Sequence, residues 1–360
     1  MKKGLLWLLL VVLVLSLVFT FSFVGCKLKT AETTVAGETT VAAEATVAAE
    51  TTAAAEATVA ANEKPLRIGY SMPAATAGYM ARAIYWATKG MSDWKAKDKN
   101  IEFFYVNAEN VTKQANDIED LITKDLDALI VWPYDASVTS VIEKAYKAGI
   151  YTVVMDRGTS KVVYDVYLSN DDEGYTRKGS EWLAKQLDYK GNIVLIEGIP
   201  CPINTTRTET IKATIAQYPD MKILDSQPGD WLKDKSLAVM ENYLQKYPKI
   251  DALYTADDDM MLGALEAYKE SGRTDMKYFL GGACDKNVIK MIMDGSEPLI
   301  QADVTYPPDQ CATVVGVAVL GARGEVYEGF YQKKLPTRII LAAELVTKEN
   351  AAAYYFPDEP

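Results

Sequence analysis

Short apolar runs alternate with stretches of helical spacing along most of the chain. The runs are rich in β-branched and aromatic residues, which favours strands. Between them apolar residues recur at helical intervals, as Met80, Ile84 and Ala87 do, which predicts helices that bury one side. The predicted strands cover residues 66–71, 101–106, 128–132, 151–155, 192–197, 223–225, 252–255, 278–281 and 299–302.

This alternation predicts an α/β fold built from βαβ units with parallel sheets. The fixed hand of the crossovers places the carboxyl ends of the strands on one edge of each sheet. Ligands of open α/β sheets bind outside that edge. The residues that follow each strand are therefore the candidates for a binding site.

These positions are rich in carboxylate, guanidinium and aromatic side chains. Carboxylates accept hydrogen bonds from hydroxyl groups, and arginine donates several in a fixed geometry. Aromatic rings can cover the C–H faces of a sugar ring. Together they predict a carbohydrate pocket. Its candidate residues are Ser71, Tyr79, Trp132, Asp156, Arg157, Arg207, Trp231, Asp257 and Tyr306.

Structural roles are the alternative for each candidate. Asp156 and Arg157 can form an ion pair at the end of a strand, and Ser71 can cap a turn. Asp257 precedes an apolar helical run, where an acidic residue caps a helix. Trp132 and Trp231 can belong to the core. Paired carboxylates in a cleft can also serve a glycosidase as acid and base.

The N-terminus carries an export signal. Lys2 and Lys3 precede an apolar run that ends at Gly25 and Cys26. The pattern resembles the lipobox of bacterial lipoproteins, although Phe23 stands where leucine is usual, and predicts a signal peptide at 1–25 and a lipid on Cys26. The alternative is an uncleaved membrane anchor, because the run is long enough to span a bilayer. Both place the remaining chain outside the cytoplasm.

Residues 26–63 are predicted to be a disordered tether. Glutamates recur every six residues in this Thr-, Ala- and Val-rich tract, at Glu32, Glu38, Glu44, Glu50 and Glu56. That step matches neither the helical nor the strand period, so no continuous apolar face forms. Without a face to bury, the segment cannot offset its ordering entropy.

Composition excludes several classes of function. The net charge of −11 argues against a nucleic-acid surface. The chain has no histidine, which removes Ser-His-Asp and Cys-His catalysis and histidine-based metal sites. Beyond Cys26 only Cys201, Cys284 and Cys311 remain, which is too few for a disulfide scaffold. We expect no metal and no cofactor.

Residues 65–350 resemble the periplasmic sugar-binding proteins of ABC transporters, of the ribose-binding type that shares its lobes with LacI-family repressor cores. The resemblance rests on the order and spacing of "LRIGYSMP", "DALIVWPYDAS", "YTVVMDRG", "SQPGDW", "YTADDDMMLGALEAYKESG", "VTYPPDQ" and "LVTKEN". It implies a type I periplasmic binding protein, with two doubly wound parallel-sheet (Rossmann-like) lobes joined by a three-segment hinge. The implied lobes are 64–170 with 307–335 and 171–306 with 336–350, followed by a tail at 351–360.

The resemblance also implies sugar-contacting roles. The positions that match the contacts of the family are Ser71, Asp156, Arg157, Arg207, Trp231 and Asp257. Two departures argue against ribose in the same pose. Asp257 stands where ribose binders have asparagine, and Tyr306 replaces a polar amide. A hexose or another pentose is the expected ligand.

The implied function is a non-catalytic lipoprotein that captures a monosaccharide between two lobes and delivers it to an ABC permease. We expect a monomer held at the cell membrane. Alternatives are a nucleoside- or signal-molecule-binding lipoprotein, and a sugar sensor for chemotaxis or a kinase. An extracellular glycosidase ranks below these. A repressor is excluded by the missing DNA-binding helices and the export signal.

Overall fold

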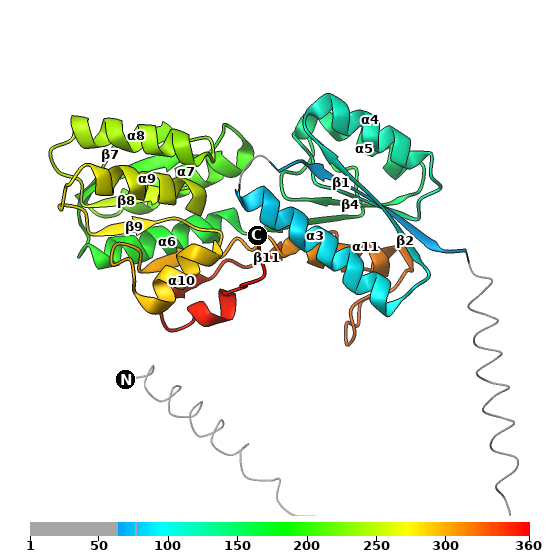
Figure 1. The fold of residues 1–360 in the computed structure, drawn as a ribbon. Helices are drawn as coiled ribbons and strands as arrows, with labels where there is room; N and C mark the ends of the chain where they lie inside the picture. The colour runs from blue at the N-terminus through cyan, green and yellow to red at the C-terminus, as the bar shows by residue number, and fades with distance from the viewer. Residues whose placement is uncertain (1–63, 76–77) are drawn as a thin grey trace, which may run out of the picture. The chain divides into compact units, whose positions relative to one another are not determined.

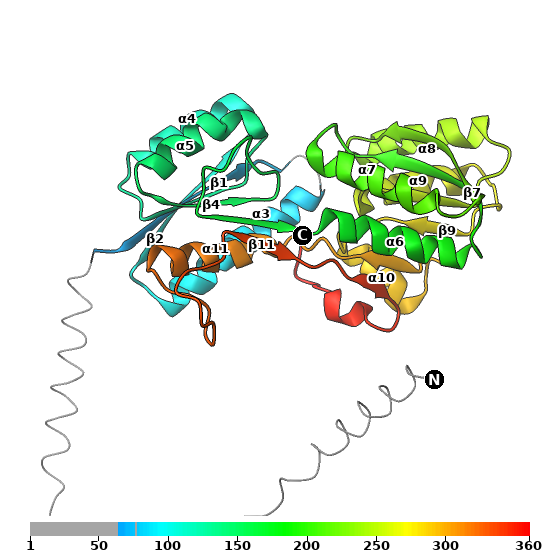
Figure 2. The same cartoon turned by 180° about the vertical axis from the view of Figure 1, so that it is seen from behind.

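The computed structural model describes residues 64–75 and 78–360, which belong to one compact unit. The predicted signal peptide, the tether and Cys26 lie outside the described residues. Two parallel sheets dominate the described part, and helices cover both faces of each (Figures 1 and 2). The predicted α/β class with doubly wound parallel sheets is confirmed.

The first sheet has six parallel strands in the order β11-β5-β4-β3-β1-β2. Helices α3 and α11 lie on one face, and α4 and α5 lie on the other (Figure 1). We call these elements the first lobe. Their bounds are β1 Leu66–Pro73, α3 Gly78–Lys97, β2 Ile101–Ala108, α4 Val111–Ile122, β3 Ala128–Val131, α5 Thr139–Lys147, β4 Tyr151–Met155, β5 Val166–Asn170, α11 Gln310–Ala322 and β11 Arg338–Leu341, with a 3-10 turn η1 at Ala136–Val138.

Strand β3 shows how the sequence places this sheet between two helical layers. Its four residues are all apolar and all buried. Ala128 and Ile130 face the core beneath α3 and α11, whereas Leu129 and Val131 face the core beneath α4 and α5. The side chains of a strand alternate between faces, so a continuous apolar run indicates a sheet covered on both sides.

The second sheet has four parallel strands in the order β7-β6-β8-β9. Helices α8, α9 and α10 pack on one face, and α6 and α7 pack on the other. With the antiparallel pair β10–β12 we call these elements the second lobe. Their bounds are α6 Asp172–Gln186, β6 Lys190–Glu197, α7 Pro202–Ile215, β7 Asp220–Pro228, α8 Lys233–Lys246, β8 Ala252–Thr255, α9 Asp258–Glu270, β9 Tyr278–Leu280, α10 Lys286–Asp294, β10 Ala302–Val304 and β12 Leu345–Thr347, with η2 at Ala351–Tyr354.

The chain passes between the lobes three times, after β5, after β10 and after β11. The last crossing lies later than expected. The resemblance implies that residues 336–350 belong to the second lobe, but β11 within them pairs with β5 of the first sheet, and only β12 pairs with β10. The apolar pattern does not predict strands β5, β11 and β12, because β5 ends in the polar residues Ser169 and Asn170 and because β11 and β12 are only partly buried. The strand expected at 299–302 begins only at Ala302.

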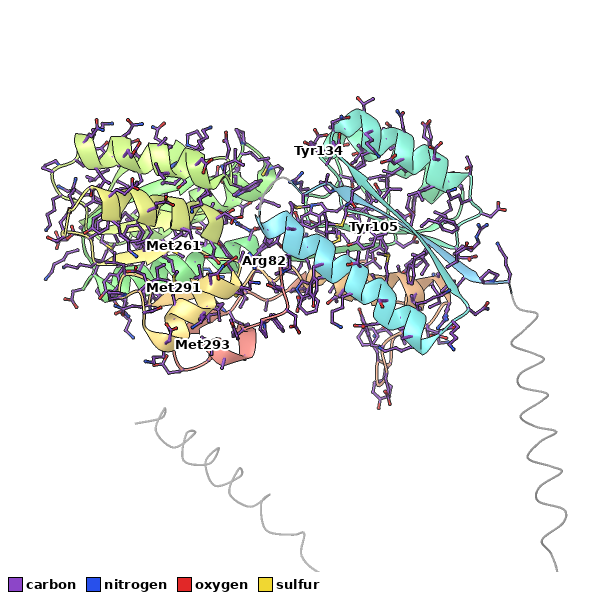
Figure 3. All side chains as sticks on the ribbon, viewed as in Figure 1. Arg82, Tyr105, Tyr134, Met261, Met291 and Met293 are labelled. Atoms are coloured by element: carbon purple, nitrogen blue, oxygen red, sulfur yellow. The ribbon has the colours of Figure 1, made fainter. Side chains whose placement is uncertain are left out.

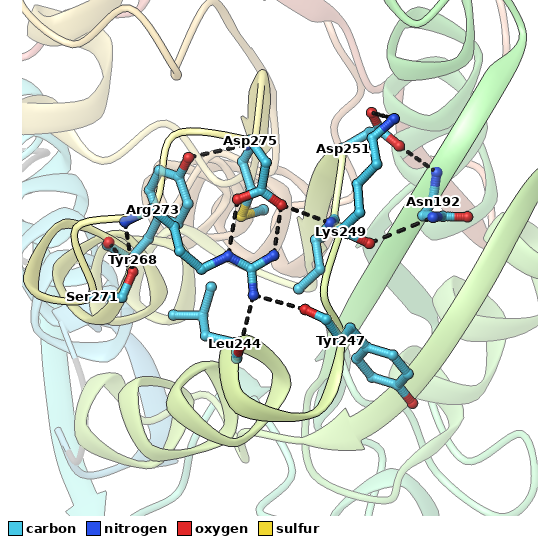
Figure 4. A network of polar contacts seen from close by, with 11 residues as sticks. Asn192, Leu244, Tyr247, Lys249, Asp251, Tyr268, Ser271, Arg273 and Asp275 are labelled. Atoms are coloured by element: carbon cyan, nitrogen blue, oxygen red, sulfur yellow. Dashed lines mark hydrogen bonds and ion pairs between the residues drawn. The ribbon is translucent and has the colours of Figure 1, made fainter.

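The loops behind the second sheet are fastened by ionic side chains (Figure 4). Arg273 forms a bidentate contact with Asp275 at 2.9 and 2.6 Å and donates to the carbonyl oxygens of Leu244 and Tyr247. It therefore joins the end of α8 to the segment that enters β9. These contacts lie at the amino ends of the strands, opposite the edge where ligands of such sheets bind, so we assign Arg273 a role in stabilising the fold.

A buried pair of carboxyl groups holds the loop after β9. Asp258 accepts hydrogen bonds from the amides of Gly282 and Asp285, each at 2.8 Å, and Asp303 accepts one from Cys284 N at 3.1 Å. Both side chains are buried. Burial is the main cause that raises the pKa of Asp303 to about 7, and the pKa of Asp258 is also raised, by burial and by the charge of Asp303.

Close helix packing makes Gly90 of α3 intolerant of a side chain. A Cβ atom there would lie 2.6 Å from the Cα atom of Ala312 in α11. We predict that Gly90→Ala lowers the free energy of unfolding by about 1–3 kcal/mol. Gly316→Ala is the control on the same helix pair, because its Cβ would make an ordinary 3.4 Å contact with Trp94. Urea unfolding measures both, and equal stabilities would contradict the packing argument.

The carboxyl pair predicts a pH dependence of stability. Because the pKa of Asp303 is raised in the folded state, that state keeps its proton after the unfolded chain has lost its own. The free energy of unfolding should therefore fall as pH rises from about 4 towards 7. Asp303→Asn should flatten this slope, and urea titrations at pH 5 and pH 8 measure it. An unchanged slope in the variant would contradict the assignment.

Candidate functional site

The predicted site residues gather where the carboxyl ends of the two sheets meet the crossings. Trp132 and Asp156 follow β3 and β4 in the first lobe. Arg207 lies on α7 and Asp257 begins α9 in the second lobe. Tyr306 lies in the crossing between β10 and α11. Topology thus brings together residues that are far apart in the sequence.

Asp156 is the buried carboxylate of the first lobe, with 3% of its surface exposed. Its Oδ2 atom accepts hydrogen bonds from Tyr306 Oη at 3.0 Å and from Gln310 Nε2 at 3.2 Å. Burial raises the pKa of Asp156, and the charge of Arg157 opposes this effect. Its backbone has φ of 59°, in the left-handed region that non-glycine residues rarely adopt. Such strain at a strand end is typical of functional positions.

Arg207 is the buried cation of the second lobe. Its Nε and Nη2 atoms each lie 2.9 Å from Asp172 Oδ1, and Nη1 donates to Ala256 O at 2.6 Å. Its guanidinium stacks between two rings, 4.2 Å from the centroid of Tyr175 and 4.4 Å from that of Tyr306. Burial raises the pKa of Asp172 to about 6, and Arg207 limits that rise. The guanidinium is therefore fixed before any ligand arrives.

Aromatic side chains line the junction of the lobes. The ring of Tyr79 lies 6.4 Å from that of Trp132 and 6.0 Å from that of Tyr306, measured between centroids. Tyr79 Oη also accepts a hydrogen bond from Gln310 Nε2 at 3.1 Å. Burial raises the pKa of Tyr79, so this phenol stays neutral. These rings form an apolar surface at the junction of the lobes, and its contact with a sugar ring stays a prediction.

Ser71 takes part in a hydrogen-bond network that holds the loop after β3. Its Oγ atom accepts a hydrogen bond from Gln114 Nε2 at 3.3 Å, and the same amide group contacts Trp132 O and Tyr134 N. Gln114 therefore fixes the loop after β3. A ligand contact by Ser71 stays a prediction, because its described contact is structural.

Arg157 lies beside the same loop. Its Nη1 atom donates to Tyr134 O at 2.5 Å, and its guanidinium lies 6.0 Å from the centroid of the Tyr134 ring. Tyr134 is labelled at the edge of the first lobe in Figure 3. The Arg157 side chain is half-buried, whereas Asp156 is buried. Asp156 thus places a carboxylate in the buried part of the site, and Arg157 places a guanidinium in its more exposed part.

Trp231 is presented by a strained turn after β7. Asp230 and Trp231 have φ of 59° and 58°, both in the left-handed region. A Cβ atom on Gly198 would lie 2.3 Å from the Trp231 ring, so the indole rests against glycine backbone at the end of β6. The side chain is half-buried. Glycine at 198 is what allows the ring this position.

Asp257 caps α9, which is the structural role that the sequence predicts as the alternative to sugar binding. Its Oδ1 atom accepts a hydrogen bond from Met260 N at 2.9 Å. Burial raises its pKa to about 7, with a further contribution from the charge of Asp259. Asp259 Oδ2 in turn accepts a hydrogen bond from Tyr79 N of the first lobe at 3.2 Å. Capping the helix occupies one oxygen of Asp257 and fixes the carboxylate at the strand edge.

Sequence reasoning missed four polar and aromatic residues of this site. Gln310 is fully buried beside Asp156, and Asn170 ends β5, the strand next to β4. Asp172 and Tyr175 hold Arg207. Three of them follow or end β5, which the apolar pattern did not reveal. Gln310 belongs to the "VTYPPDQ" segment, four residues after Tyr306.

Buried polar atoms without a partner cluster in this region. In the described part of the chain four such side-chain atoms exist: Trp132 Nε1, Asn170 Nδ2, Gln310 Oε1 and Arg82 Nε. The first three belong to residues at the carboxyl edge of the first sheet. Leaving a buried donor or acceptor unpaired costs about 1–3 kcal/mol. Two donors and one acceptor at one sheet edge are suited to a ligand with several hydroxyl groups.

Within residues 64–75 and 78–360, no group of three or more Cys, Asp or Glu side chains could hold a metal ion. No helix in this part of the chain is long and apolar enough to cross a membrane. Cys284 and Cys311 are buried free thiols, and Cys201 is a half-buried one.

Comparison with known proteins identifies relatives of this chain. The xylitol-binding protein of Mycolicibacterium smegmatis is 30% identical over 297 residues, covering 81% of this chain and 79% of that protein. The ribose import binding protein of Bacillus subtilis is 27% identical over 290 residues, covering 80% and 89%.

A solved ABC transporter solute binding protein from Bacillus halodurans, with bound myo-inositol, has the same fold. Its TM-score is 0.71 at 24% identity, and the match covers 82% of this chain and 99% of that one. The model of the periplasmic binding protein domain matches residues 68–324. The resemblance seen in the sequence is thereby confirmed: the chain belongs to the periplasmic binding protein family, as a type I member of the kind that serves ABC importers.

Proposed function

We propose that this protein captures a monosaccharide or a related polyol between its lobes and delivers it to an ABC permease. The observation that carries the proposal is the group of unpartnered buried polar atoms on Trp132 after β3, on Asn170 at the end of β5 and on Gln310, which is bonded to Asp156. A hydroxyl group both donates and accepts hydrogen bonds, so a ligand with several of them can satisfy these donors and this acceptor together. Relatives that bind ribose, xylitol and myo-inositol support the same class of ligand.

In this proposal residues of both lobes contact the sugar. Asp156 and Arg157 of the first lobe and Arg207 of the second lobe bond hydroxyl groups, while Trp231 stacks on the ring. Because Asp156 and Arg207 lie on different lobes, a ligand that contacts both favours the closed state. Asp257 adds a carboxylate where ribose binders have an amide, so we propose a hexose or a pentose other than ribose.

The proteins of this family are substrate-binding proteins that work outside the cytoplasm. We propose further that Cys26 carries a lipid that holds the chain at the membrane, and that the protein acts as a monomer. The tether of residues 26–63 would then let the receptor reach its permease. The sequence pattern of residues 1–26 supports this anchor.

Truncation of Asp156 tests the site. A thermal-shift screen of pentoses, hexoses, inositols and nucleosides first identifies the ligand of the unaltered chain. With that ligand, we predict that Asp156→Ala weakens binding by about 10–100-fold, because a charged acceptor is lost and Arg157 loses its counter-charge. Isothermal titration calorimetry measures the affinity. Asp120→Ala, which removes an exposed carboxylate of the same lobe, is the control. Equal affinities in the two variants would refute the site.

Mass spectrometry of the protein from membranes tests the anchor. We predict an N-terminal peptide that begins at Cys26 and carries the added mass of a lipid. Cys26→Ser should abolish that peptide. An intact Met1 in the mature protein would contradict lipidation and leave the proposed sugar site untouched.

A further inference from the structure

Residues 351–360 start on the second lobe and end against the first. Ala351, Tyr354 and Tyr355 pack on the core beneath α10. Phe356 then packs edge-on against Trp86 of α3, with ring centroids 5.3 Å apart at 84°. This segment therefore bridges the lobes at a place separate from the three crossings.

Glu359 is the centre of this bridge. Its side chain is acidic yet only 3% of its surface is exposed. Its Oε1 atom accepts a hydrogen bond from Trp86 Nε1, and its Oε2 atom lies 3.7 Å from Arg82 Nη1. Its backbone carbonyl accepts a hydrogen bond from Lys286 Nζ of α10. One residue is thus bonded from both lobes.

Arg82 extends the bridge towards the site. It projects from α3 at the junction of the lobes (Figure 3) and is 3% exposed. Its Nη1 atom donates to Ala283 O at 3.0 Å and to Cys284 O at 2.9 Å, both in the loop after β9. Its guanidinium also lies 5.6 Å from the centroid of the Tyr79 ring. Arg82 therefore links Glu359 to an aromatic residue of the binding site.

We propose that residues 356–359 form a strap that holds the two lobes together, with Glu359 and Arg82 as positioning residues for Tyr79 and the loop after β9. In this proposal, opening the cleft moves α3 away from α10 and breaks the contacts of Glu359 with one helix or the other. The strap therefore stabilises the closed arrangement selectively and lowers the population of the open one. This inference does not depend on the identity of the ligand.

The charges at the junction explain why Glu359 matters. Arg82 also faces Asp285, whose Oδ2 atom lies 3.9 Å from Arg82 Nε. Removing Glu359 takes one of three carboxylates, with Asp285 and Asp258, from a buried guanidinium, and it leaves Trp86 Nε1 without its acceptor. A buried charge that loses a partner is costly. The cost falls on the closed state, because in the open state these groups are free to meet water.

Hydrogen–deuterium exchange of the full chain without ligand tests the strap. The reporter is the amide of Tyr79, whose acceptor, Asp259 Oδ2, belongs to the other lobe. We expect Glu359→Ala to speed exchange at this amide by about tenfold, since the loss of a charged hydrogen bond shifts the opening equilibrium by that order. Trp86→Phe keeps an aromatic ring, though a smaller one, and removes the donor, so a smaller rise is expected.

The control is Asp358→Ala, which removes the same charge from the neighbouring, exposed residue. It should leave exchange at Tyr79 unchanged. The proposal is overturned if Glu359→Ala behaves like Asp358→Ala, or if faster exchange stays within residues 351–360. It is also overturned if α8, which lies far from the strap, exchanges faster to the same extent, because the effect is then general destabilisation.

Discussion

Tyr306 makes the contact on which the site depends, since it joins a buried anion of one lobe to a buried cation of the other. Its hydroxyl group donates to Asp156 at 3.0 Å, and its ring covers the guanidinium of Arg207 at 4.4 Å. The residue lies in the second crossing, where the chain is shared by the two lobes. Asp156 also accepts a hydrogen bond from Gln310, and Arg207 is also paired with Asp172, so Tyr306 is the residue that the two buried charges share. The crossing therefore positions the site as well as connecting the lobes.

Other buried carboxylates at the junction of the lobes also have hydrogen-bond or ionic partners. Each buried carboxylate is satisfied by backbone amides, by tyrosine or by arginine, as Asp258 is by the amides of Gly282 and Asp285. Several carboxyl groups nevertheless keep a raised pKa because burial outweighs these contacts. A ligand with many hydroxyl groups is well suited to such a site, because it can donate to carboxylates and accept from arginine without adding a charge of its own.

The sequence predicted the fold more fully than the site. Apolar runs that are buried on both faces, such as β3, are easy to recognise, and each is followed by candidate residues that lie at the sheet edge. Strand β5 is less apolar and ends in Ser169 and Asn170, so it was overlooked together with Asp172 and Tyr175 just beyond it. Gln310 could not be found by this logic, because it begins a helix rather than ending a strand. Its proximity to Asp156 arises from the packing of α11 on the first sheet.

A crystal structure of the protein with its screened sugar would show whether the buried residues between the lobes bind it. We expect the sugar between the lobes, with hydroxyl groups within hydrogen-bond distance of Asp156 and Arg207 and with partners for Trp132 Nε1, Asn170 Nδ2 and Gln310 Oε1. A sugar bound elsewhere, or one that leaves Asp156 and Arg207 without a contact, would contradict this expectation.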